Sequence, residues 1–251
     1  MEEIKQNIED KLNLNHDFDY LLILDFEATC SNDEKLSVQE IIEFPIVILD
    51  LKKNVILSEY FHTYVKPVFH PILTKFCTEL THITQDQVDE GVILEQAIQQ
   101  ADEFLNKMGI IDTKFAFVCC GDFDLGQCLR LETKFKKINY PKYFKQYINI
   151  KKQFPKEWYT ESIIKWNKPP GMVAMLKAIK LELEGTHHSG LDDSKNIARI
   201  AQYMVKHNIV WTKEMLVKVQ QDKVKEKKTK KEKKLLKQNE QQDDLKGKNN
   251  E

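Results

Sequence analysis

Residues 20–27 read YLLILDFE. An apolar run of this length is short for a helix and rich in strand-forming residues, so it predicts a β-strand buried on both faces. The two-residue period of a strand places the carboxylates of Asp25 and Glu27 on one face and Phe26 on the other. Neighbouring carboxylates repel each other unless a cation is present, and oxygen ligands suit a hard ion such as Mg²⁺ or Mn²⁺. The competing interpretation is a strand end that emerges into water with acidic residues as its first loop positions.

The segments that follow predict a hairpin and then alternating helices and strands. Residues 41–49 and 55–65 are extended and joined by a polar turn, and Pro45 favours an edge, a bulge or a late start for the first of them. A helix with a capping box at Thr84 and Gln87 carries apolar residues at helical spacing up to Met108. A second short apolar run, residues 115–119, is followed by another helical pattern.

The C-terminal half adds two more helices. Pro169 and Pro170 open one, Gly185 closes it, and the last runs from about Leu191 to His207. We therefore expect an α/β domain with a mixed sheet covered by helices on both faces.

Composition excludes several classes of protein. The chain has 251 residues, a formal net charge of -1 and five cysteines without a C-x-x-C pair, which favours a reducing compartment over a disulfide scaffold or zinc ribbon. No apolar segment is long enough to cross a membrane, and the N-terminus lacks a signal-peptide pattern. We expect an intracellular protein, cytoplasmic or nuclear, that does not bind membranes.

Three regions are expected along the chain. They are a polar segment at residues 1–18, a catalytic domain at 19–210, and a lysine-rich tail at 211–251 that is helical or disordered. The lysine run at 225–234 could contact phosphate backbones or serve as a nuclear import signal. A tail that only keeps the protein in solution explains the run equally well.

A third carboxylate follows the strand expected at residues 115–119. Asp122 and Asp124 both lie at the start of the next helix, and helical spacing favours an inward side chain for Asp124 without excluding Asp122. An ordinary capping role explains either residue equally well.

Residues 187–193, HHSGLDD, contain two His–Asp pairs with the same spacing. Asp193 continues the apolar stripe of the last helix, whereas Asp192 continues a polar one, so Asp193 is expected to face the interior. A buried carboxylate needs a partner, and a metal shared with Asp25 would supply it. His188, in the turn before the helix, is placed to take a proton from water near neutral pH. Taken alone, either histidine is better explained as a surface loop residue.

In combination these motifs resemble the DEDDh group of 3′-to-5′ exonucleases, and within it the Eri-type RNA exonucleases. The stretches that carry the resemblance are DFEATC at 25–30, EIIEFP at 40–45, YVKP at 64–67, LTHITQ at 80–85 and HSGLDDSKNIA at 188–198. The resemblance spans about residues 18 to 210 and implies an RNase H-like (DnaQ-like) exonuclease fold.

The resemblance also implies the site residues. Asp25, Glu27, Asp124 and Asp193 would hold two Mg²⁺ ions, or alternatively Mn²⁺, and His188 would be the general base. The implied substrate-binding residues are Thr29, His82, Ile83 and Phe123. His82 stands where glycine is usual in relatives.

The implied activity is that of a 3′-to-5′ exoribonuclease that trims RNA 3′ ends and releases nucleoside monophosphates. The alternatives are a noncatalytic RNA-binding or scaffold component of a ribonucleoprotein, and a DNA exonuclease of the same fold. RNA 3′ ends and ribonucleoproteins are the expected partners. Only about 18 residues precede the first strand, so we expect no dedicated N-terminal nucleic-acid-binding domain. The lysine run and the aromatic, lysine-containing segment 151–168 are its candidate substitutes.

Overall fold

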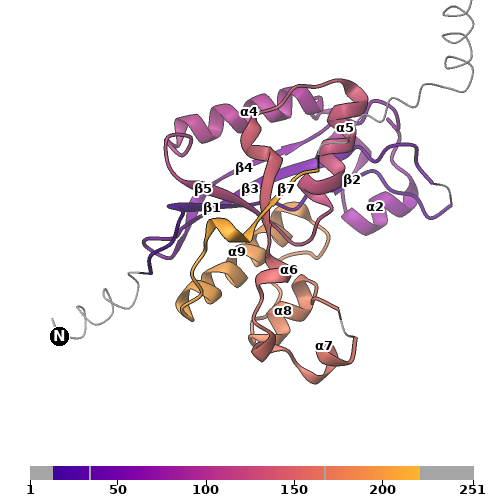
Figure 1. Ribbon diagram of the computed structural model, residues 1–251. Coiled ribbons are helices and arrows are strands. Elements are labelled where there is room, and N and C mark those ends of the chain that lie inside the picture. Colours follow the sequence, from indigo (N-terminus) through magenta and orange to yellow (C-terminus); the bar gives the residue numbers. More distant parts are fainter. Residues whose placement is uncertain (1–13, 34, 167, 221–251) are drawn as a thin grey trace, which may run out of the picture. The chain divides into compact units, whose positions relative to one another are not determined.

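A mixed β-sheet organises the computed structural model, which describes residues 14–33, 35–166 and 168–220 (Figure 1). All elements belong to the unit formed by residues 1–219. The strand order is β2-β3-β1-β5-β6-β7, with β4 paired to β3. The strands are β1 (Tyr20–Ile23), β2 (Glu27–Ala28), β3 (Ile41–Asp50), β4 (Val55–Tyr64), β5 (Phe115–Cys119), β6 (Gln146–Asn149) and β7 (Leu216–Lys218).

The strand expected at residues 20–26 is interrupted. β1 ends at Ile23, and β2 resumes at Glu27 with the same antiparallel register against β3, since Ile23 pairs with Val47 and Glu27 with Glu43. β1 also pairs in parallel with β5, and its side chains from Leu21 onward are fully buried, as an apolar strand with both faces covered requires. The acidic residues therefore lie at a break in a central strand.

Pro45 lies neither at a sheet edge nor at a late strand start, but it is paired on one side only, which agrees with the expectation that this proline avoids a fully paired central position. Pro45 lies inside β3. On one side, β3 pairs with β2 at Glu43 and with β1 at Val47, and Pro45 lies between these two positions. On the other side, Pro45 pairs with His62 of β4. Proline lacks the amide hydrogen of a sheet ladder. The break between β1 and β2 explains how a central strand accommodates it.

Helices cover both faces of the sheet, as expected (Figure 1). α4 packs through its apolar stripe on one core and α8 and α9 on the other. The helices are α2 (Lys75–Thr81), α3 (Gln85–Asp89), α4 (Leu94–Lys107), α5 (Leu129–Lys136), α6 (Ile150–Gln153), α7 (Glu161–Trp166), α8 (Met172–Ala178) and α9 (Gly190–Lys206), with a π-helical turn η1 (Asp124–Cys128), and 3₁₀ turns η2 (Lys142–Lys145), η3 (Lys156–Trp158) and η4 (Lys213–Met215).

The C-terminal boundary differs from the one expected after residue 210. Trp211 is fully buried, and β7 pairs with β6, so the folded unit continues to about residue 218. The helix expected up to Gly185 ends at Ala178, because Lys180 adopts a left-handed conformation with φ 60°. The lysine run at 225–234 and most of the segment at 1–18 lie outside the described residues. Among the described helices, none is long and apolar enough to cross a membrane.

Candidate active site

Three carboxylates meet at the break between β1 and β2. Asp25 lies in this break, Glu27 begins β2, and Asp193 comes from the first turn of α9. One carboxylate oxygen of each lies within 4.8 Å of the others. Glu27 and Asp193 are only 9% and 4% exposed. The structure thus brings together residues that are up to 168 positions apart in sequence.

Asp124 joins this group from η1, at the end of β5. Because β5 runs parallel to β1, the carboxyl ends of both strands lie at the same edge of the sheet. The amide of Phe26 donates a hydrogen bond of 2.9 Å to Oδ1 of Asp124. Asp122 points elsewhere, since its half-exposed carboxylate pairs with Lys152 at 2.8 Å. The structure therefore places Asp124, and not Asp122, beside the carboxylates of the β1–β2 break.

The carboxylates of the cluster repel one another, which favours the binding of a positive charge. Burial, and then the charges of Asp124, Glu27 and Asp193, raise the pKa of Asp25 well above its ordinary value. Burial and the neighbouring Glu43 raise the pKa of Glu27 to about 9. Burial also raises the pKa of Asp124, to about 6, and that of Asp193. Carboxylates forced together without a cation favour the protonated form for this reason.

An orphaned oxygen tests whether a metal fits. Oδ1 of Asp193 is buried and has no hydrogen-bond partner among the described residues. A buried acceptor without a partner is costly unless something binds it. An all-carboxylate donor set suits hard divalent cations, so Asp25, Glu27, Asp124 and Asp193 fit Mg²⁺ or Mn²⁺.

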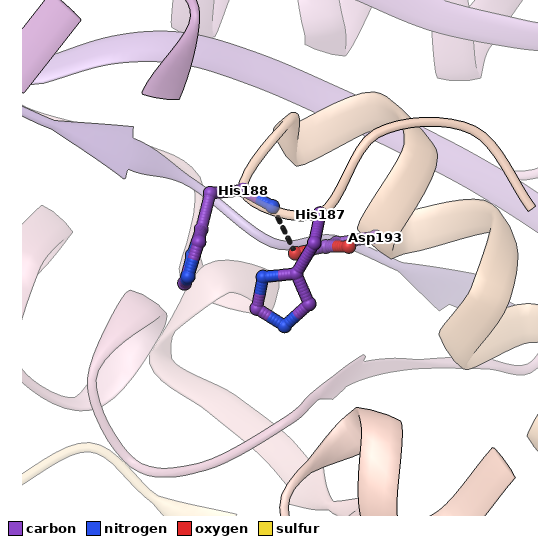
Figure 2. A group of neighbouring side chains, drawn as sticks. All are labelled: His187, His188 and Asp193. Atoms are coloured by element: carbon purple, nitrogen blue, oxygen red, sulfur yellow. Dashed lines mark hydrogen bonds between the residues drawn. The ribbon is translucent and has the colours of Figure 1, made fainter. Parts of the chain in front are cut away.

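His188 lies in the turn before α9, at the edge of the cluster. Its backbone has φ 66°, and its amide donates a hydrogen bond of 3.0 Å to Oδ2 of Asp193 (Figure 2). Burial, and then the nearby His187 and His82, lower the pKa of its imidazole. An exposed and neutral imidazole is able to accept a proton at neutral pH.

Glu43 is a site residue that the sequence reasoning did not single out. Its buried carboxylate in β3 accepts hydrogen bonds from the amides of Gly190 and Leu191, at 2.8 and 3.2 Å, and contacts Nε2 of His62 at 2.8 Å. These amides begin α9 and lack partners within the helix. A Cβ on Gly190 would lie 2.5 Å from the carbonyl oxygen of Asp25, so only glycine allows this approach. The available signal was a charged residue in the middle of an apolar strand.

The four expected substrate-binding residues occupy different surroundings. The amide of Thr29 donates to the carbonyl of Glu40 at 2.8 Å, so this amide is not free for a nucleotide. Ile83 is 3% exposed and packs with Ile42, so in this conformation its side chain is not available to contact a nucleotide. His82 is exposed and ends α2 with φ 62°, the left-handed conformation that glycine favours.

Phe123 precedes Asp124 and is 38% exposed. Its side chain lines a cavity of about 600 Å³ between α5 and residues 35–39. Lys35, Lys134 and Phe135 also line this cavity. Aromatic rings interspersed with lysines are typical of surfaces that stack bases and contact phosphates.

Comparison with known proteins gives consistent matches. Residues 22–201 match the family model described as Exonuclease. ERI1 exoribonuclease 2 of Xenopus laevis is 41% identical over 204 residues, which cover 75% of this chain and 28% of that protein. ERI1 exoribonuclease 3 of Homo sapiens is 41% identical over 196 residues, which cover 77% and 56%.

A solved structure agrees with these matches. The nuclease domain of 3′hExo, described as a DEDDh family member bound to rAMP, superposes with a TM-score of 0.69 at 33% identity, over 76% of this chain and 94% of that domain. The chain spans less than two thirds of the length of both curated relatives.

Proposed function

The chain belongs to the exonuclease family and, within it, to the Eri-type DEDDh group, and we propose that it is a metal-dependent 3′-to-5′ exoribonuclease. It would shorten RNA from the 3′ end and release nucleoside monophosphates. Its expected partners are RNA 3′ ends, free or within ribonucleoproteins.

One observation carries the proposal. The carboxylates of Asp25, Glu27 and Asp193 converge within 4.8 Å, and one buried oxygen of Asp193 has no partner among the described residues. A structural role would favour a neutralising lysine or arginine at this point. A site that holds divalent cations explains both the convergence and the orphaned oxygen.

Two roles are assigned to the residues of the site, which are metal binding and proton transfer. Asp25, Glu27, Asp124 and Asp193 would hold two Mg²⁺ ions. These ions would supply an activated water and charge stabilisation at the leaving 3′ oxygen. His188 would accept the proton of the attacking water, because its pKa is lowered and its ring is exposed beside Asp193.

The backbone around His188 supports this role. The bond from its amide to Asp193 ties the turn to a metal-holding carboxylate. The imidazole of His188 would then stay at a fixed distance and orientation from the attacking water, as efficient proton transfer requires.

The cavity beside Phe123 supports a position for the terminal nucleotides. Phe123, which lines it, directly precedes Asp124 in the chain, and the aromatic and lysine side chains of the cavity suit a single strand that leaves the cluster. The relatives are exoribonucleases by name and the solved nuclease domain held rAMP, which favours RNA over DNA.

A time course on 5′-labelled single-stranded RNA and DNA of the same sequence tests the proposal. We expect a ladder that shortens from the 3′ end in Mg²⁺, proceeds faster on RNA, stops in EDTA and is absent for Asp25→Asn. The variant should unfold at a temperature no lower than that of the wild type, which shows that its fold is intact.

Two results would contradict the proposal. Binding of RNA without any shortening in Mg²⁺ or Mn²⁺ would favour a scaffold role. Faster shortening of DNA would support the exonuclease chemistry but would show that the substrate is DNA and not RNA.

A further inference from the structure

His187 has no part in the proposed chemistry, yet it lies against the proposed base. The ring centroids of His187 and His188 are 3.8 Å apart and their planes meet at 80°. In Figure 2 both imidazole rings extend to the same side of the turn that carries them, with the carboxylate of Asp193 beside them. One ring nitrogen from each histidine and one oxygen of Asp193 all lie within 4.8 Å of one another.

The donor set of this trio differs from that of the carboxylate cluster. Two imidazole nitrogens and one carboxylate oxygen suit a borderline transition metal such as Zn²⁺ better than Mg²⁺. Three protein ligands with a fourth position left to water form a common type of zinc site.

The distances allow such a site after a small adjustment. Zinc–ligand bonds of about 2.0–2.2 Å imply ligand atoms about 3.3–3.6 Å apart in a tetrahedral site. The trio would have to close by at most roughly 1 Å. His187 is partly exposed and His188 is exposed. The third ligand atom is the oxygen of Asp193 that lies within 4.8 Å of a ring nitrogen of each histidine.

We propose that His187, His188 and Asp193 form a Zn²⁺ site, and that its occupation inhibits the exonuclease. The inhibitory part rests on the proposed function, whereas the binding part does not. A zinc ion there would use the lone pair with which His188 would otherwise accept a proton. It would also compete for Asp193, which the Mg²⁺ site needs.

Cobalt spectroscopy tests the binding part without RNA. Co²⁺ replaces Zn²⁺ in such sites and absorbs visible light strongly when four-coordinate with nitrogen ligands, but weakly when octahedral with oxygen ligands. The metal-free full chain is titrated with Co²⁺. We expect a strong band that added Zn²⁺ abolishes, that Asp25→Asn retains, and that His187→Ala and the similarly shaped His187→Gln both lose.

A matched control uses His207, which contacts Tyr203 and Trp158 at the other end of α9. His207→Ala should retain the band. An equal band in wild type and both His187 variants, or no strong band in the wild type, would overturn the proposed site.

Inhibition is then measured as shortening of RNA at fixed Mg²⁺ and increasing Zn²⁺. Removal of His187 should raise the Zn²⁺ concentration for half-inhibition at least tenfold, and higher Mg²⁺ should raise it for the wild type. Equal sensitivity of wild type and His187→Ala would overturn the inhibitory part. If the chain shortened no RNA at all, the proposed function would fail while the cobalt result still decided the zinc site.

Discussion

The carboxylate of Glu43 accepts a hydrogen bond of 2.8 Å from the amide of Gly190, 147 residues further along the chain. This bond joins the middle of β3 to the first turn of α9. A carboxylate is favoured there because the first amides of a helix lack partners and carry partial positive charge. α9 bears Asp193, and the preceding turn bears His188. Glu43 therefore sets the position of two proposed catalytic residues through the backbone at the start of α9.

Replacement of Glu43 by glutamine should lower turnover while the fold is kept. The glutamine side chain has one acceptor oxygen, whereas the two oxygens of Glu43 accept bonds from the backbone amides of Gly190 and Leu191. The first turn of α9, which carries Asp193, would therefore be held less firmly. Residues that orient metal ligands typically contribute about 10–100-fold in metal affinity or activity. Turnover should be measured as a function of Mg²⁺ concentration, with exposed Glu59 changed to glutamine as the control. Unchanged Mg²⁺ dependence would refute the positioning role.

Glu27→Gln should stabilise the metal-free protein and abolish activity. Burial, and then Glu43 and Asp193, raise the pKa of Glu27 to about 9, so at pH 7 the metal-free fold must protonate a carboxyl that is ionised in the unfolded chain, and glutamine removes this cost. The unfolding temperature in EDTA should rise, whereas the further rise on adding Mg²⁺ should shrink because a ligand is lost. Scanning calorimetry in EDTA and in Mg²⁺ measures both effects. A variant less stable than wild type in EDTA would argue against repulsion in the cluster.

Loss of the imidazole in His188→Gln should slow turnover about 10²- to 10⁴-fold, the usual contribution of a general base. The Mg²⁺-induced rise in unfolding temperature should remain, because His188 holds no Mg²⁺ in the proposed site. Single-turnover rates under saturating RNA give the comparison, with His70→Gln as the control. Wild-type turnover in the His188 variant would exclude it as the base.

A buried ion-pair network predicts a pH-dependent loss of stability. Lys136 is 2.8 Å from Glu40 and 2.6 Å from Glu132, and both carboxylates are fully buried. Burial acts to raise the pKa of Glu40, but hydrogen bonds from Lys136 and from the amides of Val68, His70 and Phe69 outweigh it and lower this pKa. A lowered carboxyl pKa means that the contribution to stability is present above the ordinary value and lost as the pH falls.

Lys136→Met should therefore cost about 3–5 kcal/mol at pH 7, since it leaves two buried carboxylates without a counterion. The part of the cost that comes from Glu40 should shrink below about pH 4.5, its ordinary pKa, because a neutral carboxyl no longer needs the lysine. Burial raises the pKa of Glu132, so this carboxyl becomes neutral at a higher pH. Urea unfolding at pH 4 and pH 7 measures the difference, with exposed Lys107→Met as the control. A cost that grows as the pH falls would contradict the network.

Phe123→Ala should weaken RNA binding by about 1–3 kcal/mol, the usual contribution of one stacked base. Affinity is best measured in Ca²⁺, with exposed Val55→Ala as the control. Unaltered affinity would remove Phe123 from the proposed RNA path.

The elements of the fold were largely predictable from the sequence. Residues 20–27 and 115–119 gave buried strands, and the apolar stripes of α4 and α9 gave helices on the sheet. The RNase H-like fold implied by the resemblance is confirmed by the comparisons. The interruption after Ile23 was missed because an apolar run shows burial but not where a strand loses its partners.

The sequence by itself determined the alternation of strands and helices, the inward face of Asp193, and the residue types available for chemistry, because these follow from local periodicity. Tertiary structure decided which residues meet. The residue pattern left Asp122 and Asp124 open, and their separation depends on Lys152 and on the amide of Phe26. Likewise, only the hydrogen bond from the amide of Gly190 identifies Glu43 as part of the site, and only the ring contact with His188 identifies His187. Such contacts join positions far apart in sequence or depend on a turn's conformation, and local periodicity carries no information about either.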